Sequence, residues 1–351
     1  MAANERRLGR RSVAYYAIGG GLFLILTYVA LRSEAAQLVL NVSPADVLIT
    51  GLAGWSVWLT SSTRIALIAR RRFGVRIHLA DVVTLPLSMN LWSYVIPFRG
   101  GLAYSLFLLK VKYGISLKGG LALQVLNQSV SVVMIGLGAI VLAGQLGGSI
   151  PLGVAGGLLI ASPVFIALGL AAVSRLPGES RLIKGAQSLA ESVRTSLVDS
   201  LRDPVLVGSL LFLAILRFVL RGVFIYAGLR ALAAGAGFDS TVALLVLQEA
   251  AALIKVVPGN LGVSELAAGL AYGLIDSPPT EGVMVQLFMR GIALSMACTV
   301  GFFASYANIR KLDLGGLRAL VAKMRKVAQG GEAAADDDDE APAGPSADGP
   351  S

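Results

Sequence analysis

The chain has 351 residues, of which 55% are hydrophobic and 15% charged, and its mean hydropathy is +0.74. Because soluble domains carry about 25% charged residues, this composition predicts an integral membrane protein. A single cysteine, Cys298, and a single histidine, His78, exclude a disulfide framework and a zinc site built from Cys and His ligands. We therefore expect no metal, no cofactor and no Cys/His or Ser/His nucleophile.

The net charge of +9 is distributed unevenly along the chain. Residues 1–331 contain all 30 Lys and Arg, whereas residues 332–351 contain seven acids and no base. The basic residues flank apolar segments, where membrane topology usually explains them. This pattern argues against a nucleic-acid partner.

Six apolar segments are long enough to cross a hydrocarbon core of about 30 Å as helices of about 20 residues. They lie near Ser12–Leu31, Pro44–Ile68, Gly119–Ala143, Pro151–Val173, Pro204–Leu232 and Gly282–Ala307.

Two further apolar segments are interrupted by Pro and Gly and do not fit a single crossing. Leu79–Leu109 is broken at Val95–Gly101 (VIPFRGG), and Val242–Tyr272 is broken at Val256–Glu265 (VVPGNLGVSE). Non-helical backbone at membrane depth persists only where protein or water satisfies its polar groups. Each segment is therefore predicted to be a re-entrant helical hairpin that lines a cavity.

The basic loops support this topology. When the four arginines before residue 12 are placed in the cytoplasm, the basic loops all lie on that side, provided that each hairpin returns to the side it left. We expect a multi-pass protein of a bacterial or archaeal cytoplasmic membrane with both termini in the cytoplasm. The predicted divisions are a basic N-terminus (1–11), a transmembrane domain (12–310), a basic interfacial helix (311–330) and a disordered acidic tail (331–351).

The two halves of the transmembrane domain, 12–148 and 149–310, have the same order of parts in opposite orientation. Pro44 lies 53 residues before Pro97, and Pro204 lies 54 residues before Pro258. At similar offsets, Gly120 and Gln124 match Gly282 and Gln286. This spacing predicts an inverted repeat, the architecture of many transporters, and the predicted fold class is all-α.

The two interrupted segments resemble the signature segments of the lysylphosphatidylglycerol synthase transmembrane region, also called the flippase-like domain family. The resemblance rests on PFRGG, followed by a basic stretch ending in GIS (Gly114–Ser116), and on PGNLGVSE. It covers roughly residues 10–310. It implies translocation of a lipid or lipid-linked headgroup rather than aminoacylation, since only a short segment follows the last span. The acid that relatives often carry after the first motif is absent, because Leu102 and Ala103 occupy that place.

Charged side chains within the spans cost about 2.5–3.5 kcal/mol each on insertion scales and are functional candidates by default. They are Arg99, Arg217, Arg221, Lys255 and Arg290, against Glu249 and Glu265. A bound anion would neutralise the surplus positive charge, and arginine donates paired hydrogen bonds to phosphate. The alternative interpretations are that Arg99 reaches the headgroup layer and that Arg217 and Arg221 pair with the two glutamates.

The predicted substrate-binding residues are Arg99, Gly100, Arg217, Arg221, Pro258, Gly259, Asn260, Gly262 and Glu265. Glu249, Lys255, Glu265 and Arg290 are predicted to act in coupling or charge pairing, with Arg290 placed opposite Glu249. Glu265 has two interpretations, a proton carrier and a helix cap or arginine partner. Ser264 is the expected cap of the following helix.

The favoured function is translocation of an anionic phospholipid or a polyprenyl-phosphate-linked lipid, with proton coupling as a hypothesis. The alternative is a non-catalytic membrane partner of a glycosyltransferase or lipid synthase. A membrane transferase is less favoured, because general acid-base chemistry needs positioned carboxylates or histidine and only two acids lie at depth. We therefore expect that the protein is not an enzyme.

Overall fold

The computed structural model describes residues 21, 23–29, 31–32, 39, 41–95, 100–145, 181–234, 237–252 and 258–311. The predicted fourth span, the interfacial helix and the acidic tail lie outside the described residues, as do Arg99 and Lys255. The chain forms two compact units, Met1–Ala304 and Ser305–Ser351, and the description below concerns the first.

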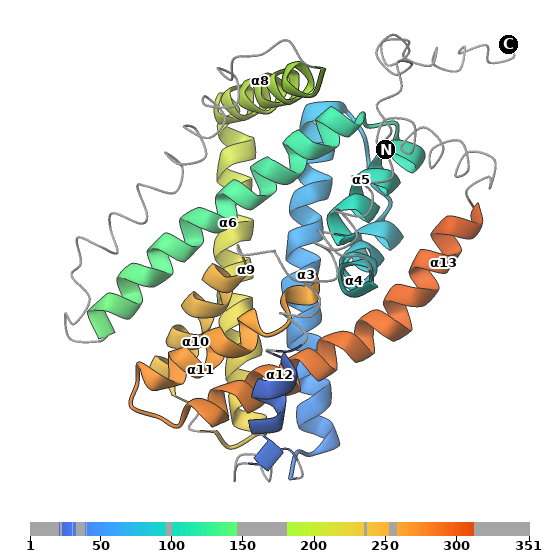
Figure 1. Cartoon of the computed structure of the whole chain (residues 1–351). Helices are drawn as coiled ribbons and strands as arrows, with labels where there is room; N and C mark the ends of the chain where they lie inside the picture. Colours follow the sequence, from blue (N-terminus) through green and yellow to red (C-terminus); the bar gives the residue numbers. More distant parts are fainter. Residues whose placement is uncertain are drawn as a thin grey trace, which may run out of the picture. The chain divides into compact units, whose positions relative to one another are not determined.

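All elements in the described part of the chain are helical (Figure 1). In chain order they are α3 (Pro44–Phe73), α4 (Leu79–Val95), α5 (Gly100–Tyr113), α6 (Leu117–Gln145), α8 (Arg181–Leu201), α9 (Pro204–Ala231), α10 (Phe238–Ala251), the 3₁₀ turn η1 (Pro258–Asn260), α11 (Val263–Gly273), α12 (Pro279–Met296), the π-helical turn η2 (Ala297–Gly301) and α13 (Phe302–Lys311).

Three of the described helices have the length and apolar composition needed to cross a membrane. They are Leu117–Gly144, Pro204–Ala231 and Pro279–Asn308. The last corresponds to the predicted sixth span and continues through the π-helical turn without a break. Helix α3 also has 30 residues, but its many Ser, Thr and Gly residues make it less apolar. These helices agree with the membrane protein that the composition predicts.

Helices α3 and α9 begin with the same capping arrangement. The Ser43 side chain accepts a hydrogen bond from the Asp46 N–H, and the Asp203 side chain accepts from the two N–H groups at Val205 and Leu206. In both helices the next residue is proline, which lacks the N–H that would otherwise be unsatisfied in the first turn. The sequence thus fixes the same local start in both predicted halves.

Helices α3 and α9 pack against each other more extensively than any other pair and run antiparallel (Figure 1). A Cβ at Gly54 would overlap the Phe224 ring, so the glycine permits this close approach. Along the seam, Thr50 lies against Gly228, Gly54 against Phe224 and Ser61 against Arg217. This opposed order of contacts establishes the antiparallel direction and brings Arg217 onto α3.

Helices α4 and α5 form an antiparallel hairpin whose two open ends are fastened together. Lys112 Nζ donates to Asp81 Oδ1 at 2.8 Å, and the Tyr113 hydroxyl donates to the same carboxylate. Burial and then this hydrogen bond raise the pKa of Tyr113, so its hydroxyl remains a donor. At the closed end, a Cβ at Gly101 would overlap the Met89 carbonyl. The chain therefore returns to the level at which the hairpin began.

Helices α10 and α11 form the second hairpin, joined by η1. The Tyr272 hydroxyl donates to the Ala234 carbonyl at 2.7 Å, which ties the end of α11 to the residues just before α10. Both residues are almost fully buried. Each hairpin therefore has a tyrosine near its open end that bonds to the start of the same hairpin.

Replacing Tyr272 by Phe is expected to lower the free energy of unfolding by about 1–3 kcal/mol, because the buried Ala234 carbonyl would lose its partner. Thermal unfolding in detergent micelles measures the change. Tyr226, which is exposed on α9, provides a matched control, and Tyr226→Phe should leave the midpoint unchanged. Equal midpoints for the two variants would show that this bond does not close the hairpin.

The tips of the two hairpins touch. A Cβ at Gly259 in η1 would overlap the Tyr94 ring near the end of α4, and α4 packs against η1. Gly259 has φ +57°, in the left-handed region that glycine adopts without strain. The contact requires glycine at this position for two independent reasons, its backbone conformation and the space available.

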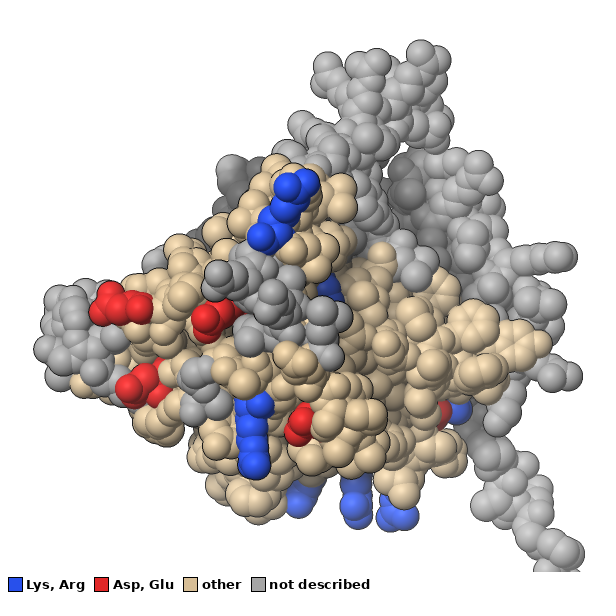
Figure 2. Space-filling view, turned by 90° about the horizontal axis from the view of Figure 1, so that it is seen from below, with Lys and Arg blue, Asp and Glu red and all other residues tan. Residues whose placement is uncertain are grey.

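The outer surface of α9 is apolar. Phe212, Ile215, Val219 and Val223 recur at helical spacing and are each about half exposed or more. Over the described residues in Figure 2 the surface is mostly uncharged, with acidic and basic side chains in small separate groups. A continuous exposed apolar stripe is unfavourable in water and suits contact with lipid chains.

Candidate functional site

A cavity of about 590 Å³ lies where the hairpin tips meet α6, α9 and α12. Its polar lining residues are Asn90, Ser93, Tyr94, Gln124, Gln128, Ser129, Arg221, Gln248, Asn260, Ser264, Gln286 and Arg290. Among the described lining residues, Arg221 and Arg290 are the only charged ones. The cavity wall is therefore polar and cationic.

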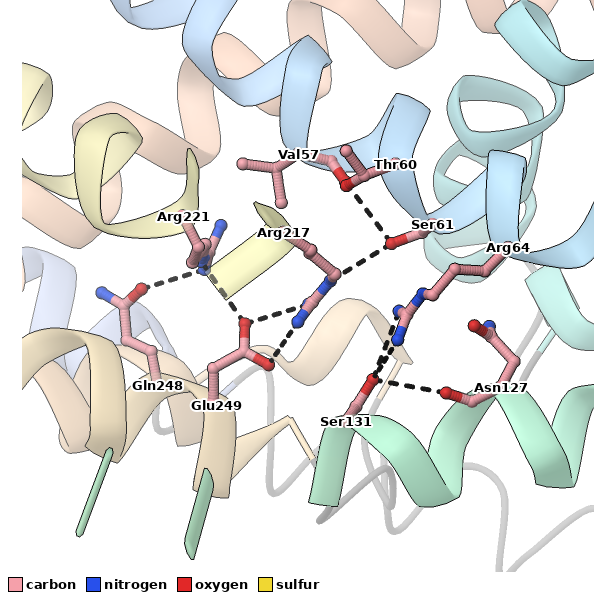
Figure 3. Close-up of polar contacts among 10 residues, drawn as sticks. All are labelled: Val57, Thr60, Ser61, Arg64, Asn127, Ser131, Arg217, Arg221, Gln248 and Glu249. Atoms are coloured by element: carbon pink, nitrogen blue, oxygen red, sulfur yellow. Dashed lines mark hydrogen bonds and ion pairs between the residues drawn. The ribbon is translucent and has the colours of Figure 1, made fainter. Parts of the chain in front are cut away.

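Arg217 is fully engaged by its neighbours beside this cavity (Figure 3). Its two terminal nitrogens, Nη1 and Nη2, each donate to one carboxylate oxygen of Glu249 at 3.0 Å, and its Nε donates to Ser61 Oγ at 3.2 Å. The Glu249 side chain is only 7% exposed. Arg217 thus joins α9 to both α10 and α3, and each of its three nitrogens donates a hydrogen bond within the protein.

Arg221 is less completely paired than Arg217, although it lies one helical turn further along α9. Its Nη2 donates to Gln248 Oε1 at 3.0 Å, and its Nε lies 3.7 Å from Glu249 Oε1. The Nε atom has no hydrogen-bond partner. Arg221 also lines the cavity, so it is the better candidate of the two for binding an anion.

Arg64 is a buried arginine that the sequence analysis did not single out. It is 2% exposed, and its two terminal nitrogens both lie 3.3 Å from Ser131 Oγ on α6 (Figure 3). Its Nε has no partner, and no described carboxylate lies within ion-pair distance. The sequence contains one signal that Arg64 faces the protein interior, because Arg64 shares a face of α3 with Val57 and Ser61 at helical spacing.

Arg290 holds the break between η1 and α11 in place. Its guanidinium donates to the Gly259 carbonyl at 2.8 Å and to the Asn260 carbonyl at 3.2 Å, and its Nε lies 2.6 Å from Glu265 Oε1. The other Glu265 oxygen accepts the Gly262 N–H at 2.8 Å. One ion pair thus satisfies several backbone groups that the interrupted helix leaves free.

Two predicted arrangements at this break are wrong. Arg290 pairs with Glu265 rather than with Glu249, because Glu249 lies against Arg217 and Arg221. Ser264 is not the cap of α11, since the N-cap position is Gly262 and the Glu265 side chain binds its N–H. Gly262 has φ +79°, which explains why glycine rather than serine occupies the cap.

Replacing Glu265 by Gln is expected to lower the free energy of unfolding by about 1.5–3 kcal/mol, because the buried Arg290 guanidinium would lose its charged partner. The amide oxygen would still accept the Gly262 N–H. Denaturant unfolding in mixed micelles measures the loss. Wild-type stability together with a loss of pH-dependent activity would instead favour the proton-carrier interpretation.

The other predicted site residues have varied locations. Gly100 is buried at the start of α5, and Pro258, Gly259 and Asn260 form η1. Of the predicted binding residues, Arg221, Gly259 and Asn260 line the cavity. Arg99 and Lys255 lie outside the described residues. The structure places Gly259 and Asn260 beside Arg221 at the cavity. Arg217 and Glu265 instead form ion pairs within the protein, with Glu249 and Arg290.

The fold and the cavity define a helical integral membrane protein in which a cavity lined by two arginines lies between the tips of two helical hairpins. A family model described as the lysylphosphatidylglycerol synthase TM region matches residues 14–301, and the chain belongs to this family. The match confirms the resemblance seen in the two motifs and includes all the described cavity-lining residues. The searches of curated proteins and of solved structures gave no match. Membership associates the chain with membrane proteins of lipid-related function.

Proposed function

We propose that this protein is a flippase that moves the anionic headgroup of a phospholipid or of a polyprenyl-phosphate-linked lipid. The observation that carries the proposal is the cavity of about 590 Å³, whose described lining residues include Arg221, Arg290 and no acid. Small-molecule sites occupy about 300–1,000 Å³, so a headgroup fits the available space. Glu265 offsets the charge of Arg290, whereas Arg221 shares Glu249 with Arg217, so a phosphate would neutralise the positive charge that this shared carboxylate leaves unbalanced.

Six spans and two re-entrant hairpins form the membrane topology in this proposal. The limbs α4, α5, α10 and α11 have 17, 14, 14 and 11 residues. Each is shorter than the roughly 20 residues that a crossing helix needs. The bonds from Tyr113 to Asp81 and from Tyr272 to Ala234 support a return of each hairpin to its own starting level. The protein would lie in the cytoplasmic membrane with both termini inside.

An inverted repeat would relate the two halves of the cavity. The matching caps of α3 and α9, the antiparallel packing of these helices and the contact between hairpin tips support it. Gln124 and Gln286, which the predicted repeat pairs, both line the cavity. Rocking of two such halves would expose the cavity to each side of the membrane in turn.

The pairing of the buried acids favours translocation over group transfer. Glu249 and Glu265 are each held by arginine, and Glu265 also accepts a backbone N–H. A general acid or base needs a carboxyl group free to exchange a proton with the reacting group. The same pairing favours a structural role for Glu265 over proton coupling.

Reconstitution into liposomes tests this proposal. The purified protein would be inserted into phosphatidylcholine vesicles containing a fluorescent anionic lipid, and chemical quenching of the outer leaflet would report exchange between leaflets. We expect faster loss of the protected inner-leaflet signal than in protein-free vesicles. A folded, inserted protein without such exchange would contradict the proposal and favour a non-catalytic partner of a glycosyltransferase or lipid synthase.

A further inference from the structure

Three arginines lie around a single described carboxylate beside the cavity (Figure 3). Arg217 donates to both oxygens of Glu249 at 3.0 Å, and the Arg221 Nε lies 3.7 Å from one of them. Arg64 forms no ion pair with a described carboxylate, because its terminal nitrogens contact the Ser131 hydroxyl and its Nε has no hydrogen-bond partner. The charges of Glu249 and Arg217 both act on Arg64, so the four ionic groups form one electrostatic cluster.

The most deeply buried of the three guanidinium groups is the one without a carboxylate. Arg64 is 2% exposed, whereas the side chains of Arg217 and Arg221 are 18% and 20% exposed. An unpaired charge becomes more costly as it is removed from water. The described arrangement therefore leaves the least solvated charge without a counter-ion, and this favours a second arrangement in which Glu249 pairs with Arg64.

Glu249 can change its second partner without leaving Arg217. The Arg217 Nε is held by Ser61, which lies one helical turn before Arg64 on the same face of α3. Arg217 occupies one acceptor position on each carboxylate oxygen, and a carboxylate has about four such positions. In Figure 3, Arg221 and Arg64 lie on opposite sides of Arg217. The remaining acceptor positions can therefore be turned toward one of these two arginines or toward the other.

The helix that carries Glu249 packs directly against the helix that holds Arg64. A Cβ at Gly138 on α6 would overlap the Val246 side chain on α10, so the two helices approach closely there. Val246 lies one turn before Glu249 on α10, and Gly138 lies two turns after Ser131 on α6. A small movement of α10 against α6 therefore changes the separation between Glu249 and Arg64.

We propose that Arg64 and Arg221 are alternative partners of Glu249, and that exchange of Glu249 between them is a charge switch. In the described arrangement Glu249 lies against Arg221. In the other it pairs with Arg64, and the charge of Arg221 becomes available to the cavity that Arg221 lines. An anion in the cavity favours the second arrangement, because it replaces Glu249 at Arg221. The effect of an anion rests on the proposed function, whereas the exchange of partners does not.

The effect of Arg64→Met in two backgrounds tests the switch without any ligand. In the otherwise wild-type protein Arg64 has no carboxylate, so Arg64→Met should leave the thermal unfolding midpoint in detergent micelles unchanged or raise it. In an Arg221→Gln protein Glu249 pairs with Arg64, so the same substitution should lower the midpoint by about 2–4 °C or more. A change that is equal in the two backgrounds, or less destabilising in the Arg221→Gln background, would overturn the proposal, because fixed partners contribute independently.

Two further variants control this comparison. Arg64→Gln keeps a donor for Ser131 and repeats the comparison if Arg64→Met does not fold. Arg71 lies seven residues after Arg64 on α3 and is exposed, so Arg71→Met should have the same effect in both backgrounds. A background-dependent effect of Arg71→Met as large as that of Arg64→Met would also contradict the switch, since the dependence would then not be specific to Arg64.

The same comparison with a lipid connects the switch to the cavity. Phosphatidylglycerol would be added to phosphatidylcholine mixed micelles that contain the otherwise wild-type protein. We expect Arg64→Met to become destabilising in its presence, as it does in the Arg221→Gln protein, because the lipid anion takes the place of Glu249. In the Arg221→Gln background phosphatidylglycerol should add no further effect. An Arg64→Met effect that is the same with and without phosphatidylglycerol would contradict the coupling of the switch to the cavity.

The switch and the flippase proposal fail independently. A background-dependent effect of Arg64→Met without leaflet exchange in liposomes would overturn the flippase proposal and support the switch. Leaflet exchange together with an Arg64→Met effect that is equal in both backgrounds would overturn the switch and support the flippase.

Discussion

Replacement of Arg221 by Gln is expected to slow leaflet exchange of an anionic lipid by about 10- to 100-fold, the range that corresponds to loss of a charge-assisted hydrogen bond of about 1.5–3 kcal/mol. Arg221 lines the cavity and shares the Glu249 carboxylate with Arg217, which holds both carboxylate oxygens at 3.0 Å, so the charge of Arg221 is only partly offset within the protein. The fold should tolerate the change, because Arg217 retains both hydrogen bonds to Glu249. The liposome assay measures the rate.

Two further variants complete this test. Arg221→Lys keeps the charge without the planar pair of donors and should recover part of the rate. Arg230, at the exposed end of the same helix, is the matched control, and Arg230→Gln should leave the rate unchanged. Wild-type exchange in a folded Arg221→Gln protein would remove Arg221 from the binding site.

Replacement of Glu249 by Met is expected to lower the free energy of unfolding by about 3–5 kcal/mol, the cost of removing one member of a buried ion pair. Glu249 is the carboxylate that Arg217 and Arg221 share, and Arg64 lies nearby with only a hydroxyl partner. Without Glu249, the buried Arg64 and the partly buried Arg217 and Arg221 would remain in this region without a carboxylate. Denaturant unfolding in mixed micelles measures the change.

The double variant Arg217→Met with Glu249→Met separates charge from packing. Replacing a buried ion pair by apolar groups of similar volume is often neutral, so the double variant should be more stable than Glu249→Met alone. A double variant that is as unstable as the sum of the single variants would show that the two side chains contribute separately. Arg217 and Glu249 would then not act as a pair.

The sequence was sufficient to predict where the individual helices and the two chain interruptions lie. The caps before Pro44 and Pro204, the lengths of the apolar segments and the Pro-Gly interruptions depend on residues close together in the chain. The helices α3, α6 and α9 accordingly lie where apolar spans were predicted, and both interrupted segments separate into two limbs. Helix α3 continues five residues past the predicted apolar span, because arginines end an apolar segment without ending a helix.

The pairing of charges could not be predicted in this way. Glu249 and Glu265 both lie in the second interrupted apolar segment, and only the rotation of α10 and α11 relative to α9 and α12 decides which arginine each one meets. The burial of Arg64 could not be predicted for the same reason, since it depends on α6 and Ser131 rather than on the position of Arg64 in α3.

The amino-acid sequence by itself determined that this is a helical membrane protein with two interrupted hairpins and an excess of buried positive charge, because hydropathy, capping and chain breaks are local properties. The tertiary structure alone decided which acid each of those arginines meets and which of the arginines line a cavity. The reason is physical: a guanidinium is satisfied by whatever lies within about 3 Å of its nitrogens, and residues distant in the chain supply those partners.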